Sequence, residues 1–464
     1  MYKFFLPQTE AGIQISVMKP VRLSALLLSL FFSIGSFSQS NQDIILVKNV
    51  TLIDGTGNPP SFNASLVIHA DTIVDISPFK APAQARIVDM GGKIIMPEII
   101  NAHAHLGLLK GTKTAYENYT SENIIRQLKK YQSYGVGAVL SLGTDYDMIF
   151  SMRDSSREGK IPGAMIFTAG FGFGAAGGGP PFNFTVTKVF RPYTPDEATA
   201  DVQQLAALQP DIIKMWVDDF YGQLPTMKPE IYKAIIDEAH RLHIRVAAHV
   251  FHIKDARQLV ADGVDALAHS IRDEDIDDAL LDAMKQKDVV YIPTLSLDEY
   301  QFIYAQKPEW IDDPFFRSSL EPGVYEMITS RDYIEKLKAN PSFPKMNGYF
   351  QTALRNLRKI FQHGIKVALG TDSGATPVRT QGFSEHLELE LMTEAGLTPL
   401  EAITCATRNG AQFLHIDNKY GTLQKGKKAN FIVLQQNPLN NIKNTRTIVA
   451  VWKDGMEVSK GPEK

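Results

Sequence analysis

The chain has 464 residues, of which 44% are hydrophobic and 21% are charged, and its formal net charge is −3. This composition is typical of a globular protein with a large buried core. Lysine and arginine do not gather into a basic stripe, so the sequence argues against nucleic acid and acidic membrane surfaces as partners and favours a small-molecule substrate. The single cysteine excludes an intrachain disulfide, and association into a homo-oligomer stays open.

The N-terminus has the pattern of a secretory signal. Lys19 and Arg22 precede the apolar run LSALLLSLFFSIGSF, which is short for a membrane span and ends in small residues. We predict that residues 1–38 are a signal peptide cut after Ser38, with Met18 as the true start. The mature protein is then periplasmic or secreted, without stable membrane insertion. An uncleaved anchor helix is the alternative.

The two ends of the remaining chain share a β-rich pattern. Over residues 39–96, short runs such as DIILVKNVTLIDGTG and ARIVDMGGKIIMP alternate β-branched residues with turn residues. The pattern returns over residues 420–464 in ANFIVLQQNP and TIVAVWKDGMEV. We therefore predict that both ends pair into one small β-sandwich beside the main domain.

The main domain, residues 97–419, alternates apolar β-rich runs with helical stretches. The β-rich runs are MPEIINAHAH, GAVLSLGTD, AMIFTAG, DIIKMWV, IRVAAHV, DALAHS, VVYIPTLS and KVALGTD. Eight such runs predict an α/β fold of the (β/α)₈ TIM-barrel type, in which functional groups lie at the C-terminal ends of the strands. A doubly wound sheet is the alternative.

His103 and His105 are the most informative pair in the sequence. Side chains one residue apart point the same way on an extended strand but diverge on a helix. Two neutral imidazoles on one face are good ligands for zinc and similar divalent ions, although a stable site needs further donors. The pair therefore predicts a metal site whose remaining ligands lie further along the chain.

Four residues at the other predicted strands are candidates for those ligands. They are Lys214 in DIIKMWV, His249 in RVAAHV, His269 in DALAHS and Asp372 in VALGTDS. In a barrel these side chains would meet at one rim. The alternatives are satisfied core histidines, a charged lysine at the rim, and an aspartate that caps a helix.

These motifs, together with GLTPLEAITCATRNGAQFL and YGTLQKGKKANFIVL, resemble the amidohydrolase superfamily, in its branch related to imidazolonepropionase and the Xaa-Pro dipeptidases. The resemblance covers residues 44–460. It implies that His103, His105 and Asp372 hold one divalent ion and that His249 and His269 hold a second, with zinc as the first choice of metal. Lys214 would be carbamylated by carbon dioxide and bridge both ions. An unmodified ammonium has no acceptor and would be repelled by two cations, so the modification makes physical sense.

The implied activity is hydrolysis of an amide-like C–N bond by water activated at two metal ions, with Asp372 as the proton carrier. A dipeptidase or carboxypeptidase, a mononuclear deaminase, and a lactonase or phosphotriesterase are alternatives on the same site, and a non-catalytic binding protein is a further one. Two departures from the family pattern stand out. Glu98 and Asn101 replace the glycine and the acid that usually precede the histidines, and the loop TAGFGFGAAGGGPPFNF lacks the histidine common in dipeptidase-like relatives.

Substrate specificity is expected from the loops. A long insertion over residues 298–348 carries several aromatic residues, which predicts either a lid over the barrel for a bulky or apolar substrate or packing among the insertion's own helices. Tyr221, in VDDFYG, and His386, in FSEHLELELM, are the predicted substrate contacts.

Overall fold

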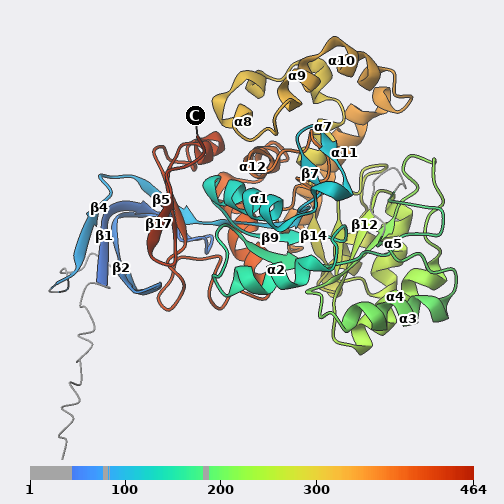
Figure 1. Ribbon diagram of the computed structural model, residues 1–464, viewed down its shortest axis with the longest axis horizontal. Helices are drawn as coiled ribbons and strands as arrows, with labels where there is room; N and C mark the ends of the chain where they lie inside the picture. The colour runs from blue at the N-terminus through green and yellow to red at the C-terminus, as the bar shows by residue number, and fades with distance from the viewer. Residues whose placement is uncertain (1–43, 77–81, 83, 181–187, 464) are drawn as a thin grey trace, which may run out of the picture. The chain divides into compact units, whose positions relative to one another are not determined.

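The computed structural model describes residues 44–76, 82, 84–180 and 188–463 (Figure 1). The predicted signal peptide over residues 1–38 and the predicted start at Met18 lie outside the described residues. None of the helices in the described part of the chain is long and apolar enough to cross a membrane.

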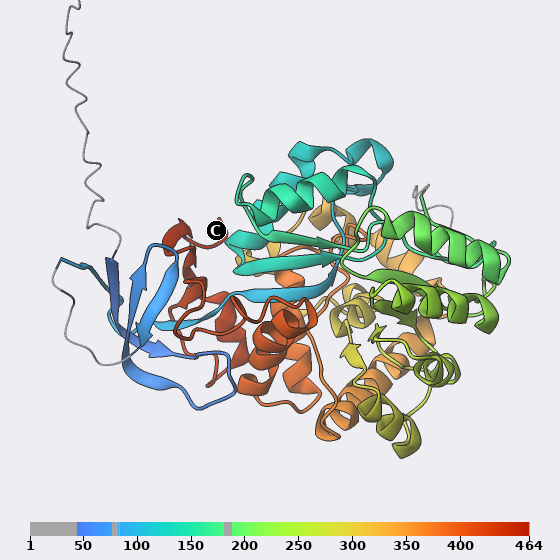
Figure 2. The same ribbon diagram turned by 90° about the horizontal axis from the view of Figure 1, so that it is seen from below.

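Strands from both ends of the chain pair in one eight-stranded sheet, with its blue and red members side by side in Figure 2. In spatial order the sheet contains β17 (Met456–Ser459), β16 (Ile448–Lys453), β15 (Phe431–Leu434), β5 (Ile94–Pro97), β1 (Ile44–Leu52), β2 (Ser61–His69) and β3 (Thr72–Ile76), while β4 (Arg86–Asp89) pairs with β1. The two ends meet where β15 runs antiparallel to β5, with Phe431 opposite Pro97. Leu66, Phe431 and Trp452 belong to the buried core of this sheet.

The segment between these ends forms two parallel sheets with helices between the strands. The first has the order β10 (Met165–Thr168), β9 (Val136–Ser141) and β6 (Ile99–Ala104). The second has the order β11 (Ile213–Val217), β12 (Val246–Val250), β13 (Ala266–Ala268) and β14 (Val290–Ile292). All residues of these seven strands are buried, as expected for parallel strands that are covered on both faces. The α/β character predicted for this region is confirmed.

Single bridges link the edges of the two parallel sheets. Phe173 pairs with Met215 of β11, which joins the chain after β10 to the second sheet. The predicted eighth strand, KVALGTD, is not assigned as a strand, but Val367 pairs with Tyr291 of β14 and Ser373 pairs with Ala104 of β6. This segment therefore lies between the last strand of the second sheet and the first strand of the first sheet.

The helices of this region follow from amphipathic spacing and from capping residues. They are α1 (Ser121–Ser133), α2 (Met148–Arg157), α3 (Pro195–Ala206), α4 (Pro229–Arg241), α5 (Ile253–Asp262), α6 (Asp278–Gln286), α11 (Phe343–Gln362), α12 (Phe383–Glu394), α13 (Pro399–Thr404) and α14 (Gly410–Phe413). In α4, Ile231, Ile235 and Ala239 recur every four residues and are buried. Thr120 and Thr194 cap α1 and α3, because each hydroxyl accepts the backbone N–H three residues on.

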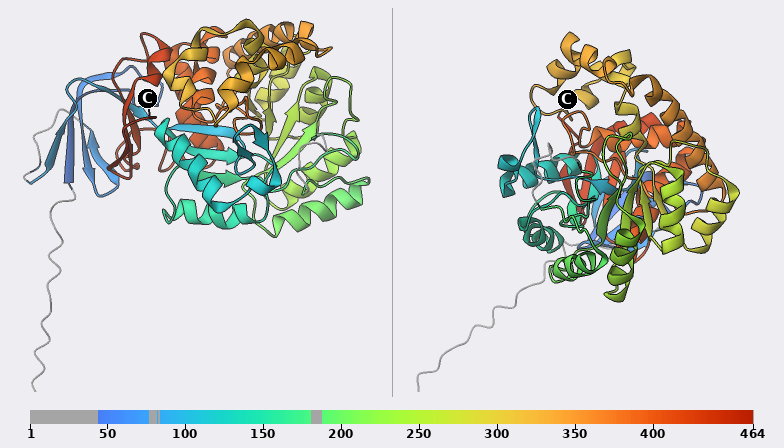
Figure 3. Two further views of the ribbon diagram at one scale, coloured as in Figure 1. Left: turned by 45° about the horizontal axis from the view of Figure 1, so that its top comes forward. Right: turned by 90° about the vertical axis from the view of Figure 1, so that its right-hand side faces the viewer.

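The insertion at residues 298–348 is helical. It contains the end of α7 (Leu295–Tyr300), the 3₁₀ turns η3 (Ile303–Gln306) and η4 (Glu309–Asp312), and the helices α8 (Pro314–Arg317), α9 (Val324–Thr329) and α10 (Arg331–Lys338). Figures 1 and 3 show α8, α9 and α10 gathered on one side of α12.

The aromatic residues of the insertion pack against one another. Tyr300 stacks on Tyr304 with ring centroids 5.6 Å apart, and Trp310 contacts Phe316 at 4.6 Å and Phe383 of α12 at 5.0 Å. Among the described residues, none of these rings lines the central cavity. The prediction of an aromatic lid is therefore wrong for these residues, and the alternative of packing among helices holds.

Candidate metal centre

A cavity of about 250 Å³ opens where the parallel strands end. The polar and charged side chains in its wall are His105, Thr114, Thr144, Asp218, His249, His269, Arg272, Gln301, Asp372 and Arg379. Aromatic and aliphatic side chains complete the wall, including Leu108, Trp216, Phe220, Tyr221 and Leu297. An apolar cavity with a few convergent polar groups is the usual form of a small-molecule site.

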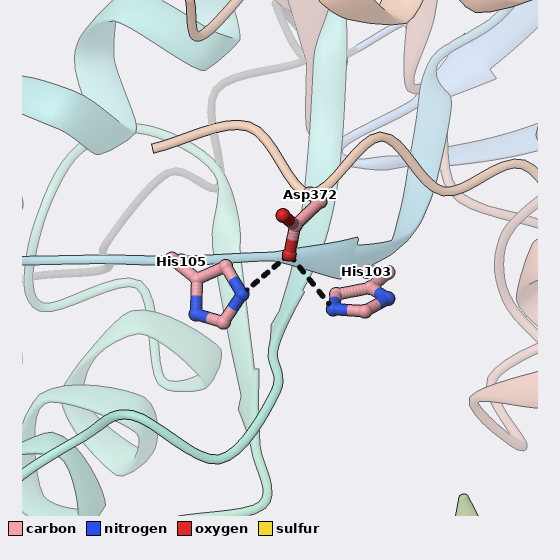
Figure 4. Close-up of side chains that lie close together, drawn as sticks. All are labelled: His103, His105 and Asp372. Atoms are coloured by element: carbon pink, nitrogen blue, oxygen red, sulfur yellow. Dashed lines mark hydrogen bonds and ion pairs between the residues drawn. The ribbon is translucent and has the colours of Figure 1, made fainter. Parts of the chain in front are cut away.

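His103, His105 and Asp372 converge on one another (Figure 4), and His105 and Asp372 line the cavity. The Oδ1 atom of Asp372 lies 3.1 Å from Nε2 of His103 and 2.7 Å from Nε2 of His105. All three side chains are buried. The sequence predicted this convergence because β6 presents both imidazoles on one face, and the chain around Asp372 lies beside that strand.

The charge state of this group suits a cation. Burial alone would raise the pKa of Asp372, but the guanidinium of Arg379 and the imidazole of His105 outweigh it and hold the pKa well below its usual range. Burial, reinforced by Lys214, lowers the pKa of His103 well below the ordinary value. The group therefore combines an ionised carboxylate with a neutral imidazole, which is the form in which these side chains bind metal.

A second pair of imidazoles adjoins the first group. The ring centroids of His249 and His269 are 4.1 Å apart, and those of His103 and His269 are 4.5 Å apart. Burial lowers the pKa of both His249 and His269, and for His269 the neighbouring His249 ring lowers it further. The structure thus brings all four predicted histidines into one continuous cluster.

Lys214 lies in β11 and is completely buried. Its Nζ atom has no hydrogen-bond partner within the described residues, and burial lowers the pKa of the amine to about 7. An unpaired ammonium is costly in such surroundings, whereas a neutral amine is a nucleophile. An unpaired Nζ whose charge acts on His103, His249 and His269 and which is influenced by Asp372 fits the predicted modification, and the whole donor set fits divalent ions such as zinc.

Gly143, just after β9, allows Lys214 to approach the backbone closely. The residue has φ +95°, and an added Cβ would lie 2.7 Å from Cγ of Lys214 and 3.0 Å from the Trp216 ring. A side chain at this position would be strained by its backbone conformation and would also collide with the lysine.

A buried hydrogen-bond network joins β6, which carries His103, to the segment that carries Asp372. Asn101 accepts the backbone N–H of His103 at 2.9 Å and donates to Glu385 at 2.6 Å. Glu385, from α12, also accepts the hydroxyls of Thr371 at 2.8 Å and Ser373 at 2.7 Å. The same carboxylate therefore ties β6 to the residues on both sides of Asp372.

Two arginines of the cavity wall were not predicted from the sequence. The buried Arg272 lies 3.0 Å from Asp298 through Nε and stacks over Phe251 at 4.5 Å, and Arg379 pairs with Oδ2 of Asp372. Neither position carries a periodic or spacing signal, although Arg272 follows His269 by three residues.

The two predicted substrate contacts have different outcomes. Tyr221 lines the cavity and packs edge-on against Phe251 at 5.3 Å, and its contact with substrate stays a prediction. His386 is completely buried in α12, and its ring nitrogens lie 3.0 Å from Thr445 Oγ1 and 2.9 Å from the Tyr134 carbonyl. Because internal groups occupy both nitrogens, the prediction that His386 contacts substrate is wrong.

Comparison with known proteins places this geometry in a family. Residues 94–458 match the model of the Amidohydrolase family. The chain is 26% identical to the ochratoxinase of Aspergillus niger over 92% of the chain and 88% of that protein. The crystal structure of that ochratoxinase superposes with a TM-score of 0.69 at 21% identity, covering 90% of this chain and 96% of that one. A crystal structure of a Xaa-Pro dipeptidase superposes with a TM-score of 0.72 at 24% identity, covering 89% of this chain and 99% of that one.

The Gly143→Ala variant should lose more stability than the strain of its left-handed backbone alone would cause. We expect a loss of about 1–3 kcal/mol in the free energy of unfolding from overpacking against Lys214, measured by denaturant titration. Gly159→Ala is the matched control, because Gly159 also has a positive φ, +70°, but an added Cβ would meet nothing within 4 Å. That control isolates the strain of the left-handed backbone, roughly 1 kcal/mol. Equal losses in both variants would contradict the close approach of Lys214.

Proposed function

Because the chain belongs to the Amidohydrolase family and is a metal-dependent hydrolase of carbon–nitrogen bonds, we propose that it hydrolyses an amide-like bond of a small, bulky or apolar substrate with two divalent ions. Zinc is the proposed metal. The observation that carries this proposal is the convergence of two ligand groups on one cavity, with the unpaired amine of Lys214 beside them.

Each ion has its own proposed ligands. His103, His105 and Asp372 hold the first ion, and their ligand atoms all lie within 4.8 Å of one another. His249 and His269 hold the second. The neutral Lys214 amine would add to carbon dioxide through a new N–C bond and lose one proton, and the resulting carbamate would supply an anionic ligand to the ions. Its negative charge compensates the two cations in a buried site.

We further propose that the two parallel sheets and the segment 366–372 together form an eight-stranded barrel. The bridges from Val367 to β14 and from Ser373 to β6 support this reading, because they place the segment between the free edges of the sheets. The same proposal includes the domain limits: the barrel spans residues 97–419, and the sheet of the two ends spans residues 39–96 and 420–464.

Asp372 is the proposed proton carrier. Bound divalent ions would lower the pKa of water from about 15.7 toward 7 and polarise the substrate carbonyl. Oδ1 of Asp372 faces the two Nε2 atoms, whereas Oδ2 faces Arg379. Asp372 would take the proton of the attacking water and deliver it to the leaving nitrogen.

The cavity wall suggests the kind of substrate. Leu108, Trp216 and Phe220 offer apolar and aromatic contact to a bulky group. The family match and the similarity to ochratoxinase over nearly the whole chain support hydrolysis of a carbon–nitrogen bond. A dipeptidase or carboxypeptidase is the second candidate, because Arg272 and Arg379 bring guanidinium groups to the wall, where a substrate carboxylate could bind.

Secretion is proposed from the N-terminal pattern of residues 1–38. The protein should be recovered from the periplasm or the medium of its native host, and N-terminal sequencing should read from Gln39. A protein that keeps residues 19–38 would contradict cleavage after Ser38 and favour the anchor helix.

The binuclear centre predicts both metal content and turnover. Metal-replete protein should contain about two divalent ions per chain by elemental analysis and should hydrolyse members of a panel of amides and dipeptides faster than lactones or phosphotriesters. Lys214→Ala should lose at least one ion and most of its turnover, because the bridging ligand is gone. Lys233→Ala, which removes an exposed lysine paired only with Asp237, is the control and should resemble wild type. A Lys214→Ala protein with unchanged ions and turnover would favour a mononuclear deaminase.

Replacing Asp372 separates proton transfer from metal binding. In Asp372→Asn the shape is kept but the amide cannot accept the proton, so kcat should fall by about 10²- to 10⁴-fold while metal content drops little. Steady-state kinetics on the best amide of the panel, with metal analysis of the same sample, measures both. If the variant keeps more than roughly a tenth of wild-type kcat, the base lies elsewhere, with Asp218 and Asp219 as the next candidates.

A further inference from the structure

His249 is held differently from the other ligand histidines. Nδ1 of His105 lies 2.6 Å from the hydroxyl of Thr144, and Nδ1 of His269 lies 2.8 Å from the hydroxyl of Thr294. Nε2 of His105 contacts Oδ1 of Asp372 at 2.7 Å, and Nε2 of His103 lies 3.1 Å from the same atom, so both face a carboxylate that is itself a proposed ligand. Nε2 of His249 contacts a carboxylate outside the proposed ligand set: Oδ2 of Asp218 lies 2.8 Å away.

This contact sets the proton position on His249. An ionised carboxylate is an acceptor only, so Nε2 of His249 must carry the hydrogen and donate it. In a neutral imidazole the lone pair then lies on Nδ1. A carboxylate behind a ligand imidazole also raises the basicity of the ring, which a threonine hydroxyl does to a smaller extent.

The local fold fixes both partners. Asp218 directly follows β11, and His249 lies in the neighbouring strand β12, where it is in register with Trp216. Oδ1 of Asp218 accepts the backbone N–H of Phe220 at 3.0 Å, and the Phe220 ring stacks on the His249 ring at 5.7 Å and 27°. The imidazole is thus held at one edge by the carboxylate and across one face by the phenyl ring, and both Asp218 and His249 are more than nine-tenths buried.

We infer that Asp218 is a positioning residue for the second metal ion: it holds His249 in the tautomer that presents Nδ1 to the cavity and strengthens that nitrogen as a ligand. This inference rests on the proposed function, because it concerns the ion assigned to His249 and His269. Asp218 acts through the imidazole and is not itself a ligand. Its carboxylate also places a negative charge behind the His249 ring, on the side away from the second ion.

The next residue in the chain provides a matched control. Asp219 has the same side chain and lies on the same loop, but it accepts the Gly222 N–H at 2.9 Å and lies 3.1 Å from Nε2 of His252. Its contacts therefore stabilise the loop without reaching His249. A loss caused only by loop disturbance would appear in both Asp219→Ala and Asp218→Ala.

The experiment measures the affinity of each ion separately. Metal-free wild type, Asp218→Ala and Asp219→Ala are titrated with Zn²⁺ against a competing chelator, and the Co²⁺ forms are compared by their visible absorption spectra. In Asp218→Ala we expect one of the two ions to bind about 10- to 100-fold more weakly and its spectrum to change, while the other ion keeps its affinity. Asp219→Ala should match wild type. Asp218→Asn, which can still accept from Nε2 but lacks the charge, should lie between Asp218→Ala and wild type.

A second readout needs no metal and no activity. In metal-free protein, nitrogen-15 NMR of the histidine side chains should show the Nε2–H tautomer for His249, assigned by the signal that disappears in His249→Gln. In Asp218→Ala this signal should shift toward a mixture of tautomers. Thermal unfolding of all variants checks that the fold is kept.

The outcomes distinguish the inference from the function on which it rests. If wild type binds two ions and Asp218→Ala binds both with wild-type affinity, the positioning role is wrong and the binuclear hydrolase stands. If Asp219→Ala weakens the same ion equally, the effect belongs to the loop and the inference is also wrong. If wild type binds fewer than two ions, the proposed centre fails, and the role of Asp218 toward a second ion fails with it.

Discussion

The burial of Lys214, next to His103, His249 and His269, is the constraint on which the rest of the site depends. Removing an amine from water without a partner favours its neutral form, and here the pKa falls to about 7. The free-energy cost of burying an ionisable group without a partner is typical of functional sites, where strongly shifted pKa values cluster. Burial is the cause of the lowered pKa, and Nζ has no hydrogen-bond partner within the described residues that would stabilise the charged form.

The polar residues before the histidine pair have partners that lie far away in the sequence. Asn101 donates to Glu385 of α12, which also accepts the hydroxyls of Thr371 and Ser373. The Glu98 carboxylate has room because residue 137 is a glycine: an added Cβ there would lie 2.3 Å from the carboxylate. Asn430, next to β15, donates to that carboxylate at 2.9 Å.

Sequence reasoning succeeded where a side chain's direction follows from its strand. His103 and His105 lie together because strand residues alternate faces, and the other candidate ligands lie near them because they are in or directly after parallel strands. It failed where tertiary contacts decide. Nothing in FSEHLELELM distinguishes a histidine that faces a cavity from His386, whose partners Tyr134 and Thr445 lie far along the chain. Arg272 and Arg379 reach the cavity through loop conformations that no periodic pattern encodes. The aromatic rings of the insertion pack against one another and do not line the cavity.

The side chains that contact the outer nitrogens of His105 and His249 differ in charge, and this difference can be related to the charge of each proposed ligand group. The first proposed ion has the Asp372 carboxylate among its own ligands, and the side chain behind His105 is a neutral threonine. The second proposed ion has two neutral imidazoles and no carboxylate of its own. A shared carbamate alone would leave that side with the smaller negative charge, and a buried cation with incomplete compensation is unfavourable. The carboxylate behind His249 would add negative charge on the side of the second proposed ion.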